Sequence, residues 1–197
     1  MRLGEHLGRL SREVRGVTVV EFGIVVPVLM TVLLGLSDLM YQSYVQTMLE
    51  GAVIKAGRDA SLEANKADQS ALDTQVRRTV ATLGPNMKFV SDRRSYQSFA
   101  LVKPETFDDK NKNGVRDKGE CFDDVNGNKR WDADPGRLNQ GGANDVTKYT
   151  VSVTYPRLFP VSALFGWSAT NTVTASTLLK NQPYKLQDVT AIASVCT

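Results

Sequence analysis

The sequence predicts an α+β protein, with a long N-terminal helix, a second helix and a small antiparallel β-sheet head that carries an Asp- and Asn-rich loop. Residues 16–41 are almost wholly apolar, and about 20 such residues let a helix cross a membrane. Short strands are expected after residue 86, and the first two are MKFV at 87–90 and SYQSFALV at 95–102. We therefore expect a basic leader at 1–16, a membrane helix at 17–64 and an α+β head at 65–197.

The composition excludes several functional classes. The 24 basic and 21 acidic residues give a net charge of +3, and the basic residues outside the leader are scattered, which argues against a nucleic-acid-binding face. His6 is the single histidine and lies in the leader, so the head has no histidine base and no His-rich zinc site. Because the sequence also contains no nucleophile elbow and no phosphate-binding loop, we expect a protein that is not an enzyme.

The charges that flank the apolar run predict its orientation. The leader contains Arg2, Arg9, Arg12 and Arg15, whereas the first basic residue after the run is Lys55. This asymmetry predicts a cytoplasmic N-terminus and a head on the other side of the membrane. The run is longer than the roughly 7–15 apolar residues of an ordinary secretory signal, and no A-x-A cleavage site ends it.

The start of the apolar run resembles a class III, prepilin-type signal. The elements are Arg15, Gly16 and Val17, with Glu21 and Phe22 at the fifth and sixth positions after the glycine. The continuation is similar to the TadE/TadG family of pseudopilins from tight-adherence (Tad/Flp) pilus systems. The resemblance implies that a prepilin peptidase cuts between Gly16 and Val17. The alternative is an uncleaved signal anchor with an incidental glutamate.

The resemblance also implies a function, a location and partners. It implies a minor pilin or pseudopilin in the bacterial cytoplasmic (inner) membrane, with a structural role in pilus assembly and adhesion. The implied partners are the prepilin peptidase, other pilins and the Tad secretion machinery, and whether the protein enters the extracellular pilus is left open. A carboxylate inside an apolar membrane span costs free energy, so the presence of Glu21 there indicates a functional role. Near a mature N-terminus, Glu21 is suited to neutralise the α-amino group of a neighbouring subunit in a low dielectric.

Helical periodicity continues beyond the membrane span. A stripe of small and apolar residues is suited to packing on the head or on another subunit, and it comprises Val45, Met48, Ala52, Val53, Ala56 and Ala60. A second helix is expected at 66–82, and Gly84-Pro85 ends it. One face of this helix is marked by Leu72, Val76, Val80 and Leu83.

Residues 107–136 form an acidic insert with a calcium-loop pattern. The first loop fits D-x-[DN]-x-[DN]-G with an acid at the twelfth place, the pattern of EF-hand loops and their relatives. Alternating oxygens would converge on a hard cation, the glycine would allow the sharp turn, and Glu120 would close the coordination sphere. The expected Ca²⁺ ligands are Asp109, Asn111, Asn113, the carbonyl of Val115, Asp117 and Glu120.

A second, weaker copy of this pattern follows the first. It has Lys129 instead of glycine at the sixth place and Pro135 at the twelfth, so it lacks the usual turn residue and the closing glutamate. The tandem resembles calcium loops of many exported bacterial proteins. Unlike EF-hand loops, those loops have no flanking helices. The alternative for both loops is a solvated turn rich in Asn, Asp and Gly. The expected ligands of the second loop are Asp124, Asn126, Asn128, the carbonyl of Arg130 and Asp132.

A calcium-bearing head allows a second functional hypothesis. The chain would then be a signal-anchored extracytoplasmic calcium-binding adhesion or ligand-binding module that never polymerises. The sequence of the mature N-terminus would discriminate between this hypothesis and a processed pilin.

Cys121 and Cys196 are the two cysteines, and neither belongs to a C-x-x-C pair. Outside the cytoplasm we expect them to form one disulfide that ties the C-terminus to the acidic insert. The alternative is two buried thiols.

The C-terminal part predicts two strands around an apolar loop. The segments KYTVSVTY and SATNTVTASTLLK alternate as half-buried strands do. The loop between them contains Leu158, Phe159, Leu164, Phe165 and Trp167, which would cover a core, face the membrane or face a partner subunit. This order of strand, loop, strand and the KNQPY ending also looks like the end of TadE-like proteins.

Overall fold

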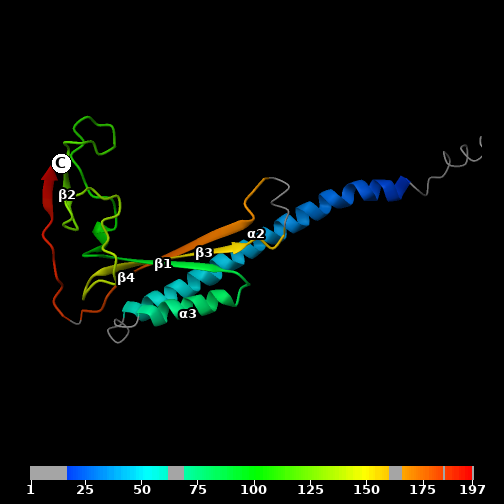
Figure 1. Ribbon diagram of the computed structural model, residues 1–197, viewed down its shortest axis with the longest axis horizontal. Coiled ribbons are helices and arrows are strands. Elements are labelled where there is room, and N and C mark those ends of the chain that lie inside the picture. The colour runs from blue at the N-terminus through cyan, green and yellow to red at the C-terminus, as the bar shows by residue number, and fades with distance from the viewer. Residues whose placement is uncertain (1–16, 62–68, 160–165, 184, 197) are drawn as a thin grey trace, which may run out of the picture. The chain divides into compact units, whose positions relative to one another are not determined.

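The computed structural model describes residues 17–61, 69–159, 166–183 and 185–196, and it has the expected α+β fold (Figure 1). Its elements, in chain order, are α2 (Val17–Ser61), α3 (Gln69–Ala81), β1 (Lys88–Tyr96), a 3₁₀ helix (Phe99–Leu101), β2 (Cys121–Asp124), β3 (Val146–Pro156), β4 (Thr170–Lys180) and β5 (Ala193–Cys196). The leader and residue 64, the expected end of the membrane helix, lie outside the described residues.

The chain divides into two compact units. The first unit contains Met1–Tyr44 and Pro156–Asn171, and the second contains Val45–Tyr155 and Thr172–Thr197. We call the first the anchor unit and the second the head unit.

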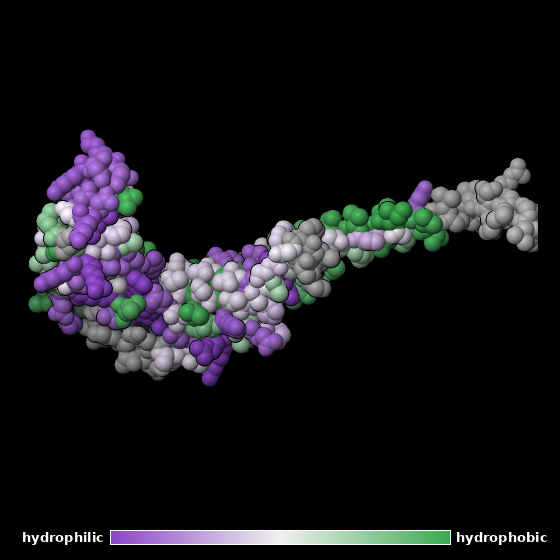
Figure 2. Space-filling view, turned by 45° about the horizontal axis from the view of Figure 1, so that its top comes forward, coloured by the Kyte–Doolittle hydropathy of each residue, from purple (hydrophilic) through white to green (hydrophobic). Residues whose placement is uncertain are grey.

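The anchor unit contains the apolar part of α2. Among the described helices, one stretch, Thr18–Ala60, is long and apolar enough to span a membrane. Up to Tyr44 the apolar side chains of this stretch are exposed or half-buried, as Val19 at 71%, Ile24 at 69% and Leu33 at 46% illustrate. Figure 2 shows this part of the helix surface as mostly hydrophobic. Such a surface requires lipid or protein around it, because water would disfavour so much contiguous apolar area.

The sheet of the head unit has the strand order β1-β3-β4. β1 and β3 are antiparallel, with Lys88 opposite Thr154 and Tyr96 opposite Val146. Burial alternates along β3, as it does in a strand with one covered face. The buried side chains include Tyr149, Val151, Val153 and Tyr155. On the other face, hydroxyl groups pair Ser152 with Thr174 and Thr154 with Thr172.

The second half of α2 is part of the core of the head unit. Its buried face repeats every three or four residues and comprises Val45, Leu49, Val53, Ala56 and Ala60. At Gly57 a Cβ atom would lie 2.6 Å from Thr177 Cγ2, so the close approach of α2 and β4 requires glycine. The expected stripe is therefore confirmed at Val45, Val53, Ala56 and Ala60. Met48 and Ala52 are only half-buried, and Leu49 is an additional core residue.

α3 is fastened to the sheet through Asp73. The Asp73 carboxylate accepts two hydrogen bonds from the Arg93 guanidinium, at 2.9 and 2.6 Å, and one from the Tyr149 hydroxyl at 2.6 Å. The guanidinium also lies over the Tyr149 ring, 4.2 Å from its centroid. Although burial alone favours the neutral acid, these partners lower the pKa of Asp73 below its ordinary value.

The expectation of two short strands at 87–90 and 95–102 is wrong. One strand, β1, runs from Lys88 to Tyr96, because all nine of its residues pair with β3. The 3₁₀ helix Phe99–Leu101 takes the place of the second expected strand. The two-stranded sheet of β2 and β5 was not expected from the sequence.

We expect Asp73→Asn to lower the free energy of unfolding of the head by about 2 kcal/mol at neutral pH, because Arg93 then loses its charged partner. Since the folded-state pKa of Asp73 is lowered, this stabilisation is present above the ordinary aspartate pKa and is lost as the pH falls below about 4. Denaturant unfolding followed by near-UV circular dichroism should therefore show the two proteins converging in acid. Asp188→Asn, at a side chain that is 87% exposed, is the matched control. A gap between wild type and variant that persists in acid would contradict the role of Asp73.

Candidate functional site

The expected processing and assembly residues lie at the start of α2. Val17 is the first residue of the helix, and Gly16 lies outside the described residues. Glu21 is exposed, and Phe22 is exposed over 68% of its surface. Both residues therefore lie in the exposed, mostly apolar part of α2.

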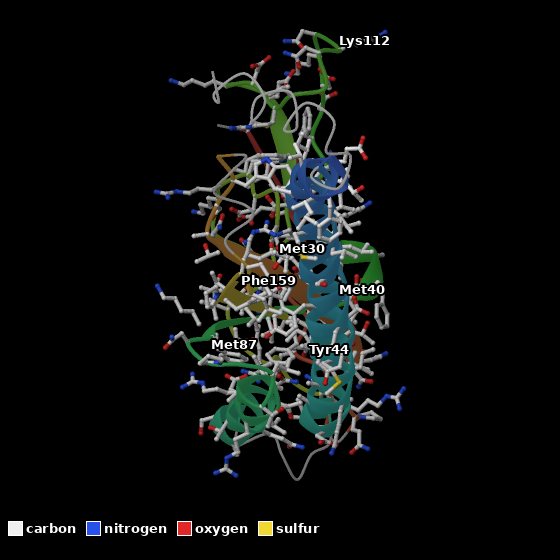
Figure 3. The ribbon with its side chains drawn as sticks, turned by 90° about the vertical axis from the view of Figure 1, so that its right-hand side faces the viewer. Met30, Met40, Tyr44, Met87, Lys112 and Phe159 are labelled. Atoms are coloured by element: carbon white, nitrogen blue, oxygen red, sulfur yellow. A yellow bond between two sulfur atoms is a disulfide. The ribbon has the colours of Figure 1, made fainter. Side chains whose placement is uncertain are left out.

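The first acidic loop folds around its own side chains. Asp109 accepts hydrogen bonds from the backbone N–H groups of Asn113 at 3.1 Å and Gly114 at 2.8 Å. The side-chain amides of Asn111 and Asn113 both donate to Asp117 Oδ2, at 2.7 and 2.8 Å. The four expected side-chain ligands that precede Glu120 are therefore gathered inside one loop. Figure 3 labels Lys112, which lies at the far end of this loop.

The second loop repeats the first almost bond for bond. Asp124 accepts from the N–H groups of Asn128 at 3.2 Å and Lys129 at 2.8 Å. The amides of Asn126 and Asn128 donate to Asp132 Oδ2 at 2.8 and 2.7 Å. The two copies that differ in sequence thus share one pattern of hydrogen bonds.

A buried glutamate closes each loop. Glu120 accepts from the N–H groups of Lys110 and Asp117, at 2.9 Å each, which are the second and ninth positions of the first loop. Glu105 accepts from Val125 and Asp132, also at 2.9 Å each, which are the same two positions of the second loop. Glu105 and Glu120 are 3% and 4% exposed. The closing glutamate that the second loop lacks at its twelfth place is thus supplied by Glu105, which precedes both loops.

The sharp turn of the second loop does not depend on glycine at the sixth position. Gly114 and Lys129 both have positive φ, at 75° and 60°, and so do Lys112 and Gly127 at the fourth positions, at 59° and 81°. Each loop therefore has one glycine and one lysine at its two left-handed positions, in opposite order. A non-glycine residue there costs of the order of 1 kcal/mol, which the hydrogen bonds to Asp109 and Asp124 offset.

The oxygens of both loops suit a hard cation. Asp and Asn side chains at alternate positions are the oxygen donors that Ca²⁺ prefers, and Glu105 and Glu120 lie beside them. Among the described residues, no cluster of three or more His, Cys, Asp or Glu side chains is arranged to hold a metal ion. In each loop, two asparagine side chains direct their amide nitrogens toward an aspartate. A half-turn of the side-chain amide exchanges its nitrogen with its oxygen, which would direct oxygens inward instead.

The disulfide and Trp131 tie the insert to other parts of the head. Cys121 and Cys196 are bonded, as expected, and they pair in register across the sheet of β2 and β5. Trp131 Nε1 donates to the backbone carbonyl of Glu105 at 2.8 Å, and its ring packs edge-on against Phe107. Trp131 thereby holds the backbone of the residue that closes the second loop.

The N-terminal part of the chain matches a known family. Residues 16–58, about a fifth of the chain, match the model of the TadE-like protein family. The match covers most of α2 and ends well before the acidic insert, and it supports a membrane-anchored component associated with the Tad pilus. Comparison with curated proteins and with solved structures found no significant match.

We expect Glu105→Gln and Glu120→Gln each to lower the free energy of unfolding by about 1–3 kcal/mol. A carboxylate accepts from two N–H groups, whereas the amide of glutamine accepts with one oxygen and turns a second donor toward the other N–H. Asp108→Asn, at an exposed carboxylate in the same segment, is the matched control and should change stability little. Thermal unfolding measures all three. If Glu105→Gln behaved like the control, the equivalence of the two glutamates would be refuted.

Proposed function

We propose that this protein is a minor pilin or pseudopilin of a tight-adherence pilus, with a structural role rather than a catalytic one. The single observation that carries the proposal is the TadE-like match over 16–58, which includes the exposed apolar part of α2. A prepilin peptidase cuts after Gly16, and the mature chain begins at Val17. The head is carried outside the cytoplasmic membrane, where it contributes to assembly and adhesion.

Glu21 supports assembly in this proposal. It is exposed on an apolar helix surface, where a lone carboxylate is costly unless an opposite charge compensates it. Cleavage after Gly16 would create a free α-amino group at Val17, four residues before Glu21. A neighbouring subunit offers that amino group as the compensating charge when the helices pack together.

The paired acidic loops each hold a structural calcium ion in this proposal. The first ion is held by Asp109, Asn111, Asn113, Asp117, Glu120 and the Val115 carbonyl. The second is held by Asp124, Asn126, Asn128, Asp132, the Arg130 carbonyl and Glu105. Because the two loops share one hydrogen-bond pattern, we propose an ion in both of them. Calcium concentrations outside a cell are sufficient for sites of the order of 10⁻⁴–10⁻³ M.

Processing and assembly are tested in cells that make Tad pili. Mass spectrometry of the mature protein should find Val17 as its first residue. Glu21→Gln should leave the head folded and reduce incorporation into sheared pili roughly tenfold, equivalent to about 1.4 kcal/mol of lost subunit contact. Glu50→Gln, at an exposed glutamate of α2 in the head unit, is the matched control. An intact leader on the membrane-bound protein would refute the processed pilin and favour the non-polymerising adhesion module.

Calcium binding is tested by calorimetry and thermal unfolding of the purified chain after EDTA treatment. We expect two ions per chain, and a stabilisation of about 2–3 kcal/mol per site when calcium exceeds the dissociation constant about a hundredfold. Asp109→Ala should remove one ion and Asp124→Ala the other, while Asp108→Ala should remove neither. Absence of heat and of any melting shift in millimolar calcium would refute the ion in both loops.

A further inference from the structure

The acidic insert is built from an internal repeat of 15 residues. The first copy, ETFDDKNKNGVRDKG, covers 105–119, and the second copy, ECFDDVNGNKRWDAD, covers 120–134. Each copy begins with a buried glutamate, and its calcium-loop pattern starts four positions later. Glu105 belongs to the first copy, yet its carboxylate closes the loop of the second copy. Glu120 begins the second copy, and its carboxylate closes the loop of the first. The two copies therefore exchange their closing glutamates.

The starts of the two copies pair with each other in an antiparallel manner. Phe107 and Phe122, which are counterparts in the repeat, form the bridge at the centre. On one side of this bridge, the N–H of Asp108 donates to a carbonyl of the second copy at 2.8 Å. On the other side, the N–H of Asp123 donates to a carbonyl of the first copy at 2.9 Å. Asp108 and Asp123 are also counterparts, so the paired segments, 105–109 and 120–124, are related by a local two-fold axis.

The eighth residue of each loop follows the same symmetry with different chemistry. Trp131 donates through Nε1 to the backbone carbonyl of the glutamate that closes its loop, at 2.8 Å, and its ring packs edge-on against Phe107. Arg116 is its counterpart in the first loop. It donates to the carbonyl of the glutamate that closes that loop, at 3.3 Å, and its guanidinium lies 5.1 Å from the centroid of the Phe122 ring. Both loops are therefore fastened to the central pair of phenylalanines.

The exchange makes the order of each loop depend on the other loop. Glu105 and Asp109 lie at the two ends of one segment, but Glu105 closes the second loop and Asp109 begins the first. Glu120 and Asp124 have the same relation in the other segment. A cation that fixes the first aspartate of one loop therefore restrains the segment that carries the closing glutamate of the other. The first ion orders the paired segments, and the second ion then binds without that entropic cost.

We propose that residues 105–134 bind two calcium ions as one cooperative unit, in which an ion in either loop raises the affinity of the other loop. This inference rests on the calcium ions proposed above, and it is independent of cleavage and of filament assembly. Coupling of this kind typically changes an affinity by a factor of about 5 to 150, and it acts equally in both directions. Two independent loops would instead each carry their own closing glutamate.

Calorimetry of the full chain in detergent, with calcium alone after EDTA treatment, measures the coupling. After correction for two equivalent sites, we expect the second ion to bind at least about fivefold more tightly than the first. Asp109→Ala removes the ion of the first loop and should weaken the second loop by this factor. Asp124→Ala should weaken the first loop equally. Asp108→Ala, at an exposed carboxylate between the two glutamates, is the matched control and should leave both binding constants unchanged.

Amide hydrogen exchange in EDTA tests the exchange of glutamates without any ion. Glu105→Gln should raise the exchange rates several-fold at 125–132, in the other copy, and less at 106–110, which are its neighbours in sequence. Asp108→Asn is the control for a charge lost from the same segment, and it should change neither range.

The outcomes separate this inference from the proposal on which it rests. Two calcium ions that bind with equal and independent constants would overturn the coupling and leave the proposed ions intact. Absence of any calcium heat would refute the proposed ions and the coupled binding together. Faster exchange confined to 106–110 in Glu105→Gln would overturn the reciprocal closure from which the coupling follows.

Discussion

The structure depends on one helix that must satisfy two environments. Over its first part, α2 exposes apolar side chains in nearly every direction, so hydrocarbon or other apolar helices are its only favourable surroundings. From Val45 onward, a single face is buried and the other positions are polar or small apart from Met48 and Ile54. Within the head unit, Gly57 lets β4 approach the helix backbone, which a larger residue would prevent. The core of the head is therefore built directly on the element that anchors the chain.

The acidic insert is ordered by hydrogen bonds and a disulfide rather than by an apolar core. A loop rich in Asn and Asp has many backbone N–H groups and few apolar side chains with which to form a core. Here two buried carboxylates, Glu105 and Glu120, satisfy backbone donors at equivalent places, and the disulfide joins the strand that follows to the C-terminus. Each unsatisfied buried donor would cost about 1–3 kcal/mol, so these carboxylates contribute substantially to the order of the insert.

Local patterns in the sequence were sufficient to predict the helices and the longest strands, β3 and β4. Stripes such as Leu72, Val76 and Val80, and the alternation of β3, reflect periods of 3.6 and 2 that few other structures share. The features that the sequence did not predict depend on distant partners. Glu105 resembles any solvated glutamate until the fold brings it to the second loop, and β5 is too short to be recognised without β2. Strand β1 was predicted as two pieces because Arg93 and Arg94 interrupt its apolar pattern, although Asp73 and Asp92 compensate their charges.

The most direct test of the two-environment helix is spin-label accessibility along α2 in nanodiscs. Labels at Ile24 and Leu33 should relax with lipid-soluble oxygen, a label at Ile54 with a water-soluble nickel complex, and a label at Val53 with neither. Ile54 is 44% exposed whereas its neighbour Val53 is fully buried, so this pair gives the sharpest contrast. A water-accessible Leu33, or a lipid-accessible Ile54, would contradict the account.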